Sequence, residues 1–392
     1  MPSRETFAYR RALKLRAQRA VDDTDSAIDT IFTRAQDDFL TFCTLMDKAP
    51  AHHMLEWHKH LITGVSNRYL LDIAGPNLDI LAPRGSAKST VLNMFTAWII
   101  GRHTSNGMPL QIIYCSYNIA TAIPKSRIIK QIIDSSSFKK IFPKVKLKAG
   151  MQSDIGWSID FDYAGIDRVG DEEFTLRAAG LRGSITSKRA HLVIVDDPIK
   201  SSADIKNPAV RDEMNNNWSS VIAPIVFEGG RSICLGTRFH PLDIHKTMFS
   251  PSKGWKQVSQ EALTYDSEGD AVSYWPEQWS VEYLQQQKEL DPVAFAFQYQ
   301  QQPVMTSDLV LSPDLIVKGE VETEFDSLAV GIDLSASKNE TSDYTAFVLG
   351  GRLKDKFYII DAHQVRSIGN LEKIDLLCDM LVEWGILELQ GD

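Results

Sequence analysis

Four short apolar runs, separated by helical stretches that we expect to be amphipathic, constrain the fold of this chain more than any other sequence feature. They read LDILAP (78–83), LQIIYCSY (110–117), HLVIVDD (191–197) and RSICLGT (231–237). Because each run is apolar on both faces, the sequence predicts a mostly parallel sheet that helices cover on both sides. Two further segments, GWSIDFDYAG and EEFTLRAAG, alternate more regularly and predict an antiparallel pair.

The loop after the first apolar run is similar to a phosphate-binding loop. It reads LAPRGSAKST (81–90), with Ala82 and Ala87 where the usual motif has its two glycines. A strand, a tight loop and a helix beginning at Lys88 direct backbone N–H groups toward one point, which favours phosphate binding. Alanine keeps most of glycine's small size but loses its freedom at positive φ. An ordinary turn that contains Lys-Ser therefore stays an alternative.

The apolar run HLVIVDDP ends in two adjacent carboxylates, as the metal-binding strand of a P-loop ATPase does. Asp196 is predicted to hold Mg²⁺ together with the Ser89 hydroxyl, while Asp197 orients or deprotonates the attacking water. Lys88 is predicted to contact the β- and γ-phosphates of ATP. The loop upstream favours this interpretation over the alternative, a strand-end Asp-Asp-Pro turn.

Further candidates come from the loop and from later segments. Arg84 lies inside the loop and is a candidate contact for the γ-phosphate, and Thr237 follows a strand where a γ-phosphate sensor would lie. Arg182 and Arg189 are candidates for an arginine finger, within the chain or across a ring. Structural salt bridges, and for Thr237 a strand cap, stay open as alternatives. The predicted nucleotide-binding residues are Pro83, Arg84, Gly85, Ser86, Ala87, Lys88, Ser89 and Thr90.

Length and composition limit the class of protein. A chain of 392 residues is longer than one hydrophobic core usually supports, so two domains are expected, with room for an additional arm. Its 43% hydrophobic and 24% charged residues are typical of a globular protein, and no apolar run approaches the roughly 20 residues that cross a bilayer. The N-terminal segment lacks the features of a secretory signal, and the cysteines form no CxxC pair. We expect a cytoplasmic chain without a zinc site or disulfide framework.

The net charge of −9 does not by itself indicate a nucleic-acid partner, yet two segments are locally basic. One is the arginine-rich N-terminal arm, and the other runs from Lys125 to Lys148. A solvated face and contact with DNA or a protein partner are both open interpretations of each segment.

A change of pattern near residue 303 predicts a second domain. Residues 5–47 read as helical, and a new β-rich pattern begins at 328, followed by one helix before the sequence stops at Asp392. Because one helix after the first strands does not complete an α/β domain, we expect the second domain to be incomplete. The predicted domains are a helical arm (1–54), a P-loop ATPase (55–303), a linker (304–327) and a partial second domain (328–392).

Several segments together resemble a known family. These segments, in order, are similar to the large terminase subunit of tailed double-stranded DNA phages: EWHKHLI, LAPRGSAKST, IIYCSYNIATAIPKSRIIKQII, GLRGSITSKRAHLVIVDDP, ICLGTRFHPLDIH and YWPEQWSVEYLQQQKELDPVAFAFQYQQQP. GIDLSASKNETSDYTAF resembles the start of that family's nuclease domain. The resemblance implies an α/β fold: a RecA-like P-loop ATPase with a mostly parallel sheet and an N-terminal helical arm, followed by a partial RNase H-like nuclease.

The resemblance also implies a motor that uses ATP and Mg²⁺ to move double-stranded viral DNA into a procapsid. Its implied partners are the portal ring, a small terminase subunit and further copies of the chain, in the host cytoplasm and transiently on the procapsid. Lys88 and Ser89 match the family's phosphate-binding pair, and Thr237 matches its coupling segment. Asp196 and Asp197 match its paired acids. A helicase-like nucleic-acid-dependent ATPase and a non-hydrolysing nucleotide-binding assembly protein are the alternatives.

For the second domain, the resemblance implies two metal ions, Mg²⁺ or Mn²⁺, held by carboxylates. Asp333 matches the family's first metal ligand at the end of a strand, and Asp343 is a candidate auxiliary acid. Asp361, expected to end a third strand, is a weaker candidate. Because the family's other acidic ligands belong to segments beyond the helix at 371–385, little or no nuclease activity is expected. Turn-forming acids are the alternative for Asp333 and Asp343.

Overall fold

The computed structural model describes residues 24–48, 52–166, 174–183, 185, 189–302, 319, 324–334, 345–354, 356–365 and 369–386. The chain forms two compact units, Met1–Asp308 (unit 1) and Leu309–Asp392 (unit 2). Residues 5–47 are expected to be helical, and the structure describes them from Thr24 onward. In this part the helical segment is divided in two at Asp38. The Asp38 side chain accepts a hydrogen bond from the Leu40 N–H and so begins a new helix.

Unit 1 alternates helices with short strands. Its helices are α2 (Thr24–Asp37), α3 (Phe39–Leu45), α4 (His52–Leu61), α5 (Lys88–Ser105), α6 (Ile119–Asp134), α7 (Ser136–Ile141), α8 (Phe161–Ala164), α9 (Ser202–Ile205), α10 (Pro208–Asn217), α11 (Ile244–Thr247), α12 (Val281–Leu290) and α13 (Pro292–Gln298), with the turns η1 (Trp218–Ile222), η2 (Ala223–Ile225) and η3 (Pro251–Lys253). Its strands are β1 (Leu78–Leu81), β2 (Ile112–Ser116), β3 (Leu147–Gln152), β4 (Gly156–Ile159), β5 (Leu176–Gly180), β6 (Ala190–Asp196), β7 (Val226–Gly236), β8 (Lys256–Ser259), β9 (Leu263–Tyr265) and β10 (Ala271–Ser273).

An eight-stranded sheet in the order β3-β4-β5-β2-β6-β7-β1-β8 forms the centre of unit 1. From β5 to β8 all neighbours are parallel, which confirms the mostly parallel sheet. The predicted antiparallel pair is also confirmed, since β4 and β5 are antiparallel. Both strands are buried nearly throughout, and Trp157 of β4 donates to Ser126 Oγ of α6 at 2.9 Å.

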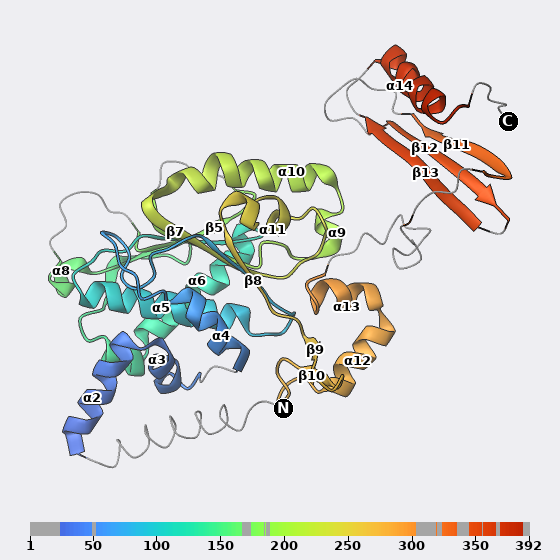
Figure 1. Ribbon diagram of the computed structural model, residues 1–392. Coiled ribbons are helices and arrows are strands. Elements are labelled where there is room, and N and C mark those ends of the chain that lie inside the picture. The colour runs from blue at the N-terminus through green and yellow to red at the C-terminus, as the bar shows by residue number, and fades with distance from the viewer. Residues whose placement is uncertain are drawn as a thin grey trace. The chain divides into compact units, whose positions relative to one another are not determined.

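Successive residues of the central strands point into two separate cores. Ile112 and Tyr114 of β2 belong to one core, together with most of α5. Ile113 and Cys115 belong to the other, which contains Trp218 and the inner face of α10. Figure 1 shows α10 and α11 on one side of the sheet and α4 and α5 on the other. The helices therefore cover both faces, as the doubly apolar strands require.

Helix α5 differs from the amphipathic pattern expected for it. Its residues are buried almost all round, from Lys88 at its start to Thr104 near its end. The reason is that α2 and α3 pack on the side that faces away from the sheet, and Trp98 donates to the Ala35 carbonyl at 3.0 Å. The expectation of an amphipathic α5 is therefore wrong, because the N-terminal helices bury its second face.

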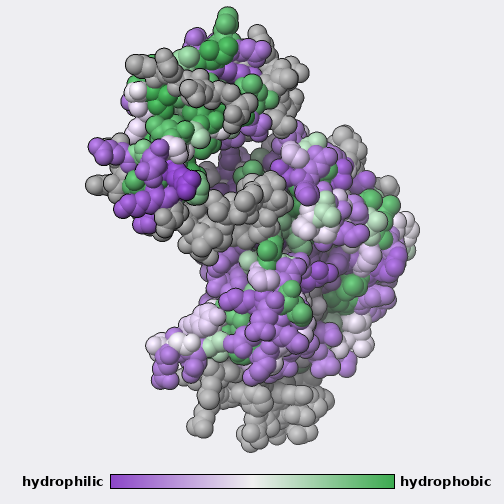
Figure 2. All heavy atoms as spheres, turned by 90° about the vertical axis from the view of Figure 1, so that its right-hand side faces the viewer, coloured by the Kyte–Doolittle hydropathy of each residue, from purple (hydrophilic) through white to green (hydrophobic). Residues whose placement is uncertain are grey.

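Unit 2 is a three-stranded antiparallel sheet with one helix. It consists of β11 (Ser327–Asp333), β12 (Thr345–Leu353), β13 (Lys356–Val365) and α14 (Asn370–Glu383). Its small core is made by Phe347 and Leu349 of β12 and Met380 of α14. Many of its hydrophobic residues are exposed, as the green areas in the upper part of Figure 2 show. The RNase H-like assignment and the domain boundaries stay predictions.

The four cysteines differ in accessibility. Cys43, Cys115 and Cys234 are buried in unit 1, whereas Cys378 is exposed on α14. Burial raises the pKa of the Cys115 thiol to about 12, so this thiol stays protonated. Within the described ranges, no helix combines the length and the hydropathy of a membrane span.

Candidate active site

A pocket lies where neighbouring strands of the large sheet end. Strands β2, β6, β7 and β1 are adjacent and parallel, so their carboxyl ends share one edge of the sheet. The pocket has a volume of about 280 Å³, and Lys88, Lys125, Asp196 and Thr237 are among the residues that line it. This edge is where open α/β sheets usually bind ligands.

The loop between β1 and α5 forms a tight turn at the pocket. Gly85 has a φ of 76°, and a Cβ at this position would lie 2.7 Å from the Trp279 ring, so glycine is needed for both conformation and space. Ala87 has a φ of 62°, which is strained because its Cβ crowds the backbone. Among the described residues, the backbone N–H groups of Gly85 and Ala87 meet no hydrogen-bond acceptor. They are therefore free to bind an anion.

The side chain of Lys88 is buried and held by two strands. Its ammonium donates to Thr237 Oγ1 at 2.9 Å and to the Pro83 carbonyl at 3.1 Å. Thr237 Oγ1 in turn donates to the Ala82 carbonyl at 2.9 Å. Thr237, the residue directly after β7, thus fixes the lysine against the loop that follows β1.

Asp196, the last residue of β6, is a buried carboxylate with three partners. Ser89 Oγ donates to its Oδ1 at 2.9 Å, the Tyr114 hydroxyl donates to Oδ2 at 3.0 Å, and Lys125 Nζ lies 3.2 Å from Oδ2. Burial first, and then the charge of Asp197, raises the pKa of Asp196 above its usual value. The Ser89 hydroxyl and the Asp196 carboxylate form the kind of oxygen pair that Mg²⁺ prefers.

Asp197 differs from Asp196 in conformation and exposure. Its φ is 47°, in the left-handed region that aspartate tolerates better than most residues. Its side chain is 45% exposed and its Oδ1 lies 3.7 Å from Lys88 Nζ. One carboxylate is therefore buried where it can hold a metal ion, and its neighbour is open to water, where it can orient a nucleophile or accept a proton.

The other predicted loop residues support the turn or face solvent. The carbonyl of Ser86 lies 3.0 Å from His53 Nε2, and Thr90 is exposed in the first turn of α5. Arg84 lines the pocket, but its Nη1 donates to Gln298 Oε1 at 3.1 Å. Its γ-phosphate contact stays a prediction.

Both arginine-finger candidates have partners within this chain. Arg182 donates to Glu213 at 2.7 Å and to the Tyr117 hydroxyl at 3.2 Å. Arg189 donates to the Pro224 carbonyl at 2.9 Å. Neither side chain is among those that line the pocket, so structural contacts account for both, and the finger role stays a prediction.

Two residues of the site were not among the sequence candidates. Tyr114 lies in the middle of an apolar strand, and its sequence surroundings gave no signal beyond a polar tip in a buried run. Lys125 belongs to the basic segment from Lys125 to Lys148 and lies in the first half of α6, which begins at the same sheet edge. Only the neighbourhood of β2 and β6 brings both residues to Asp196.

In unit 2, the described carboxylates do not converge. Asp333 ends β11 as predicted, whereas Asp361 lies inside β13, which continues to Val365; the expectation that Asp361 ends a strand is therefore wrong. Asp361 is opposite Leu349 and accepts from Trp384 Nε1 at 3.2 Å, on the α14 side of the sheet. Asp333 follows Ile332, which is opposite Phe347 and lines a pocket with it on the α14 side, so Asp333 points to the other side. Asp343 lies outside the described residues.

No family model matches the chain, and no curated protein matches it. Among solved structures, it is similar to the large terminase of a thermophilic bacteriophage, with a TM-score of 0.39 and 10% identity over 85% of this chain and 74% of that one. The HK97 bacteriophage large terminase has a TM-score of 0.35 and 17% identity, over 81% of this chain and 66% of that one. The Thermus phage P74-26 large terminase ATPase domain has a TM-score of 0.40 and 15% identity, over 67% of this chain and 97% of that one.

Proposed function

We propose that unit 1 binds and hydrolyses ATP with the help of Mg²⁺. The observation that carries this proposal is the meeting of a lysine–serine pair with twin aspartates at one sheet edge. Ser89 Oγ lies 2.9 Å from Asp196 Oδ1, although the two residues are 107 positions apart. Lys88 Nζ lies 3.7 Å from Asp197 Oδ1. This set of groups is what phosphate transfer to water requires.

The residues present fit a magnesium nucleotide. Ser89 and Asp196 would hold Mg²⁺, which when bound neutralises charge on the phosphate oxygens. The free N–H groups of the loop and the Lys88 ammonium bind phosphate oxygens. Asp197, which is exposed to the pocket, orients the attacking water and accepts its proton.

We further propose that this hydrolysis moves double-stranded DNA into a procapsid. The support is the sequence resemblance to large terminases, which begins with EWHKHLI (56–62), includes the loop at 81–90 and the segment that ends at Pro303, and covers about residues 55–390. The proposed partners are duplex DNA, a portal ring, a small terminase subunit and further copies of this chain in a ring, in the host cytoplasm and transiently on the procapsid. For unit 2 we propose a partial RNase H-like domain in which Asp333 and Asp343 would be ligands of Mg²⁺ or Mn²⁺, with little or no nuclease activity in this chain.

The first experiment measures ATP hydrolysis by the parent chain and by Lys88→Ala and Asp196→Ala variants. We expect each substitution to lower turnover by at least about 100-fold, because each removes a group that stabilises the transferring phosphate. Lys59→Ala is the matched control, since Lys59 is a surface lysine paired with Glu56. A Lys88→Ala protein that hydrolyses ATP at the parent rate would exclude the proposed site.

The second experiment separates the motor from its alternatives. We expect duplex DNA to raise the rate of ATP hydrolysis by the parent chain. Unwinding of a forked duplex would favour a helicase-like enzyme. ATP binding without phosphate release, even with DNA and a portal ring present, would favour a nucleotide-binding assembly protein.

A further inference from the structure

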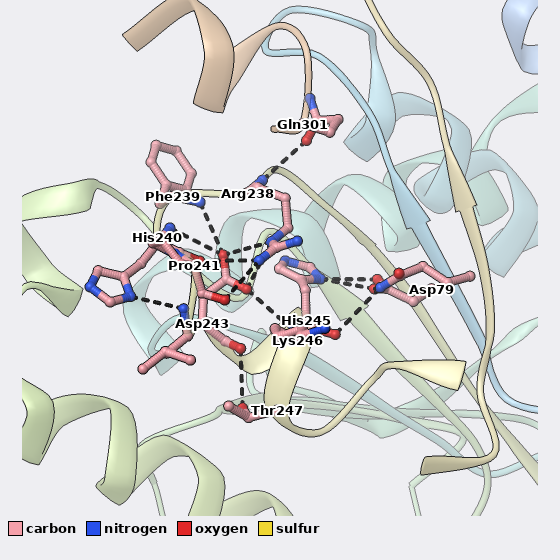
Figure 3. A network of polar contacts seen from close by, with 12 residues as sticks. Asp79, Arg238, Phe239, His240, Pro241, Asp243, His245, Lys246, Thr247 and Gln301 are labelled. Atoms are coloured by element: carbon pink, nitrogen blue, oxygen red, sulfur yellow. Dashed lines mark hydrogen bonds and ion pairs between the residues drawn. The ribbon is translucent and has the colours of Figure 1, made fainter. Parts of the chain in front are cut away.

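The turn that carries Thr237 rests on a buried polar network outside the pocket (Figure 3). The network joins Asp79 of β1 to His245 of α11, and Asp243, which caps α11, to Arg238 of the turn. In Figure 3 the His245 ring points toward the Asp79 carboxylate, and the Arg238 guanidinium lies against Asp243. The network therefore connects the strand before the phosphate loop with the segment after β7.

Asp79 and His245 form a fully buried pair. His245 Nδ1 lies 3.0 Å and 3.1 Å from the two carboxylate oxygens of Asp79, and neither side chain is exposed. Gln257 Nε2 of β8 donates to the same carboxylate at 3.0 Å. A carboxylate in the middle of a covered sheet is costly unless its partners satisfy it, so this pair is held in one arrangement.

The other edge of the His245 ring touches the backbone just before Thr237. A Cβ on Gly236 would lie 2.5 Å from Cε1 and 2.7 Å from Nε2 of His245. The ring therefore lies directly against Gly236, where only glycine leaves it room. Because Thr237 is the residue after Gly236, the position of the His245 imidazole determines where the Thr237 hydroxyl lies.

Asp243 fixes the remainder of the turn. Its carboxylate accepts from Arg238 Nε at 2.9 Å and 3.0 Å and from the backbone N–H groups of Phe239 and His240 at 3.1 Å and 3.2 Å. The Arg238 N–H donates to Gln301 Oε1 at 3.1 Å. The turn is thus closed around one buried carboxylate at the start of the helix that carries His245.

A metal site explains these contacts less well. In the described part of the chain, one group of three histidine, cysteine or acidic residues has ligand atoms that all lie within 4.8 Å of one another. It consists of Asp79, Cys234 and His245. Hydrogen bonds already use the Nδ1 of His245 and both oxygens of Asp79. Burial first, and then the charge of Asp79, raises the pKa of the Cys234 thiol, and a protonated thiol is a poor ligand.

We propose that Asp79 and His245 are positioning residues for ATP hydrolysis: they hold Gly236 and Thr237 where the Thr237 hydroxyl meets the Lys88 ammonium. The chain of contacts runs from Asp79 through His245 and Gly236 to Thr237 Oγ1, which lies 2.9 Å from Lys88 Nζ. This inference rests on the proposed function of unit 1.

The test is a double-mutant cycle on ATP hydrolysis with His245→Leu, Thr237→Ala and the double variant. We expect His245→Leu to lower kcat by about tenfold in the parent background and by less than about twofold in the Thr237→Ala background, because both changes release the same lysine. His245→Asn keeps a donor near the place of Nδ1, and we expect it to retain roughly a third or more of the parent kcat.

His103→Leu is the matched control. His103 is also fully buried and hydrogen-bonded, but to Ile99 and Leu71 near the C-terminal end of α5, the opposite end from Lys88. We expect it to lower the melting temperature as His245→Leu does while kcat stays near that of the parent. Equal losses of kcat in the two histidine variants, or a full effect of His245→Leu in the Thr237→Ala background, overturn the positioning role. If the parent chain hydrolyses no ATP, or if Lys88→Ala does not lower its rate of ATP hydrolysis, the proposed function is overturned. The positioning role of His245 is then overturned with it.

Discussion

The edge of the large sheet in unit 1 and the small sheet of unit 2 use carboxylates in opposite ways. In unit 1, the segments after parallel strands bring Asp196 and Asp197 to Lys88 and Ser89. In unit 2, Asp333 and Asp361 lie on antiparallel strands on either side of β12 and point to different faces. Segments that follow adjacent parallel strands meet at one edge of the sheet, so residues distant in the sequence converge there, whereas Asp361 lies inside its strand and on the opposite face from Asp333.

The largest expected effect tests this contrast directly. Asp196→Asn should lower ATP turnover by at least about 100-fold, because it removes the charge that would hold the metal ion. Asp361→Asn should leave turnover within about twofold of the parent, since Asp361 contacts Trp384 and His363 of its own unit. Steady-state phosphate release measures both. Equal losses would remove the contrast between the two sheets.

A second, smaller effect concerns Lys125, which balances the buried Asp196 from α6. Lys125→Ala should lower kcat/KM for ATP by about tenfold, because the pocket loses a cation that lines it and would attract the phosphates. The same change should lower the Mg²⁺ concentration needed for half-maximal activity, because the carboxylates lose a competing cation. Lys130→Ala is the control, since Lys130 lies in the same helix but pairs with Asp154. An unchanged Mg²⁺ requirement would contradict this role.

A third prediction concerns pH and sharpens the contrast in stability. Burial tends to lower the pKa of His245, but the charge and hydrogen bond of Asp79 outweigh it, so the pKa is raised above 6.5. A base whose pKa is higher in the folded chain than in the unfolded chain contributes its full stabilisation at pH values below the pKa of the unfolded chain. It loses that contribution as the pH rises through the pKa of the folded chain. We expect amide hydrogen exchange in unit 1 to report falling stability as the pH rises above about 6.5, with unit 2 as internal reference. His245→Asn should remove this dependence.

The smallest effect concerns backbone strain. Ala87→Gly should stabilise unit 1 against unfolding by about 0.5 kcal/mol, because relief of the left-handed conformation exceeds the entropy that glycine adds to the unfolded chain. Lys354 has a φ of 56° in unit 2 and provides the matched change, Lys354→Gly. Urea unfolding measures both gains, and only Ala87→Gly should alter the affinity for ATP. A loss of stability in both variants would exclude strain at these positions.

Much of the large sheet could be predicted because its strands are apolar on both faces, as HLVIVDD is. The edge strand β8 could not, since three of its four residues KQVS are polar and none of the four is buried. The burial of α5 was also missed, because it depends on the packing of α2 and α3 rather than on its own pattern. The residue pattern of a segment predicts which of its faces are buried only when the segments that pack on it are also close to it in the sequence.

The same limit explains which site residues were found. Lys88, Ser89 and Asp196 belong to short motifs whose spacing carries the chemistry. Tyr114 and Lys125 reach the site only because β2 lies beside β6, and strand order is not written in any local pattern. The Asp79–His245 pair depends on a contact between residues 166 positions apart, so no motif could reveal it.

The different exposure of the cysteines has a practical consequence. Because three thiols are buried in unit 1 and Cys378 is exposed on α14, a maleimide dye should react at one place in the native chain. The unaltered sequence thus offers a single handle on unit 2, from which fluorescence could follow that unit while nucleotide turns over in the other.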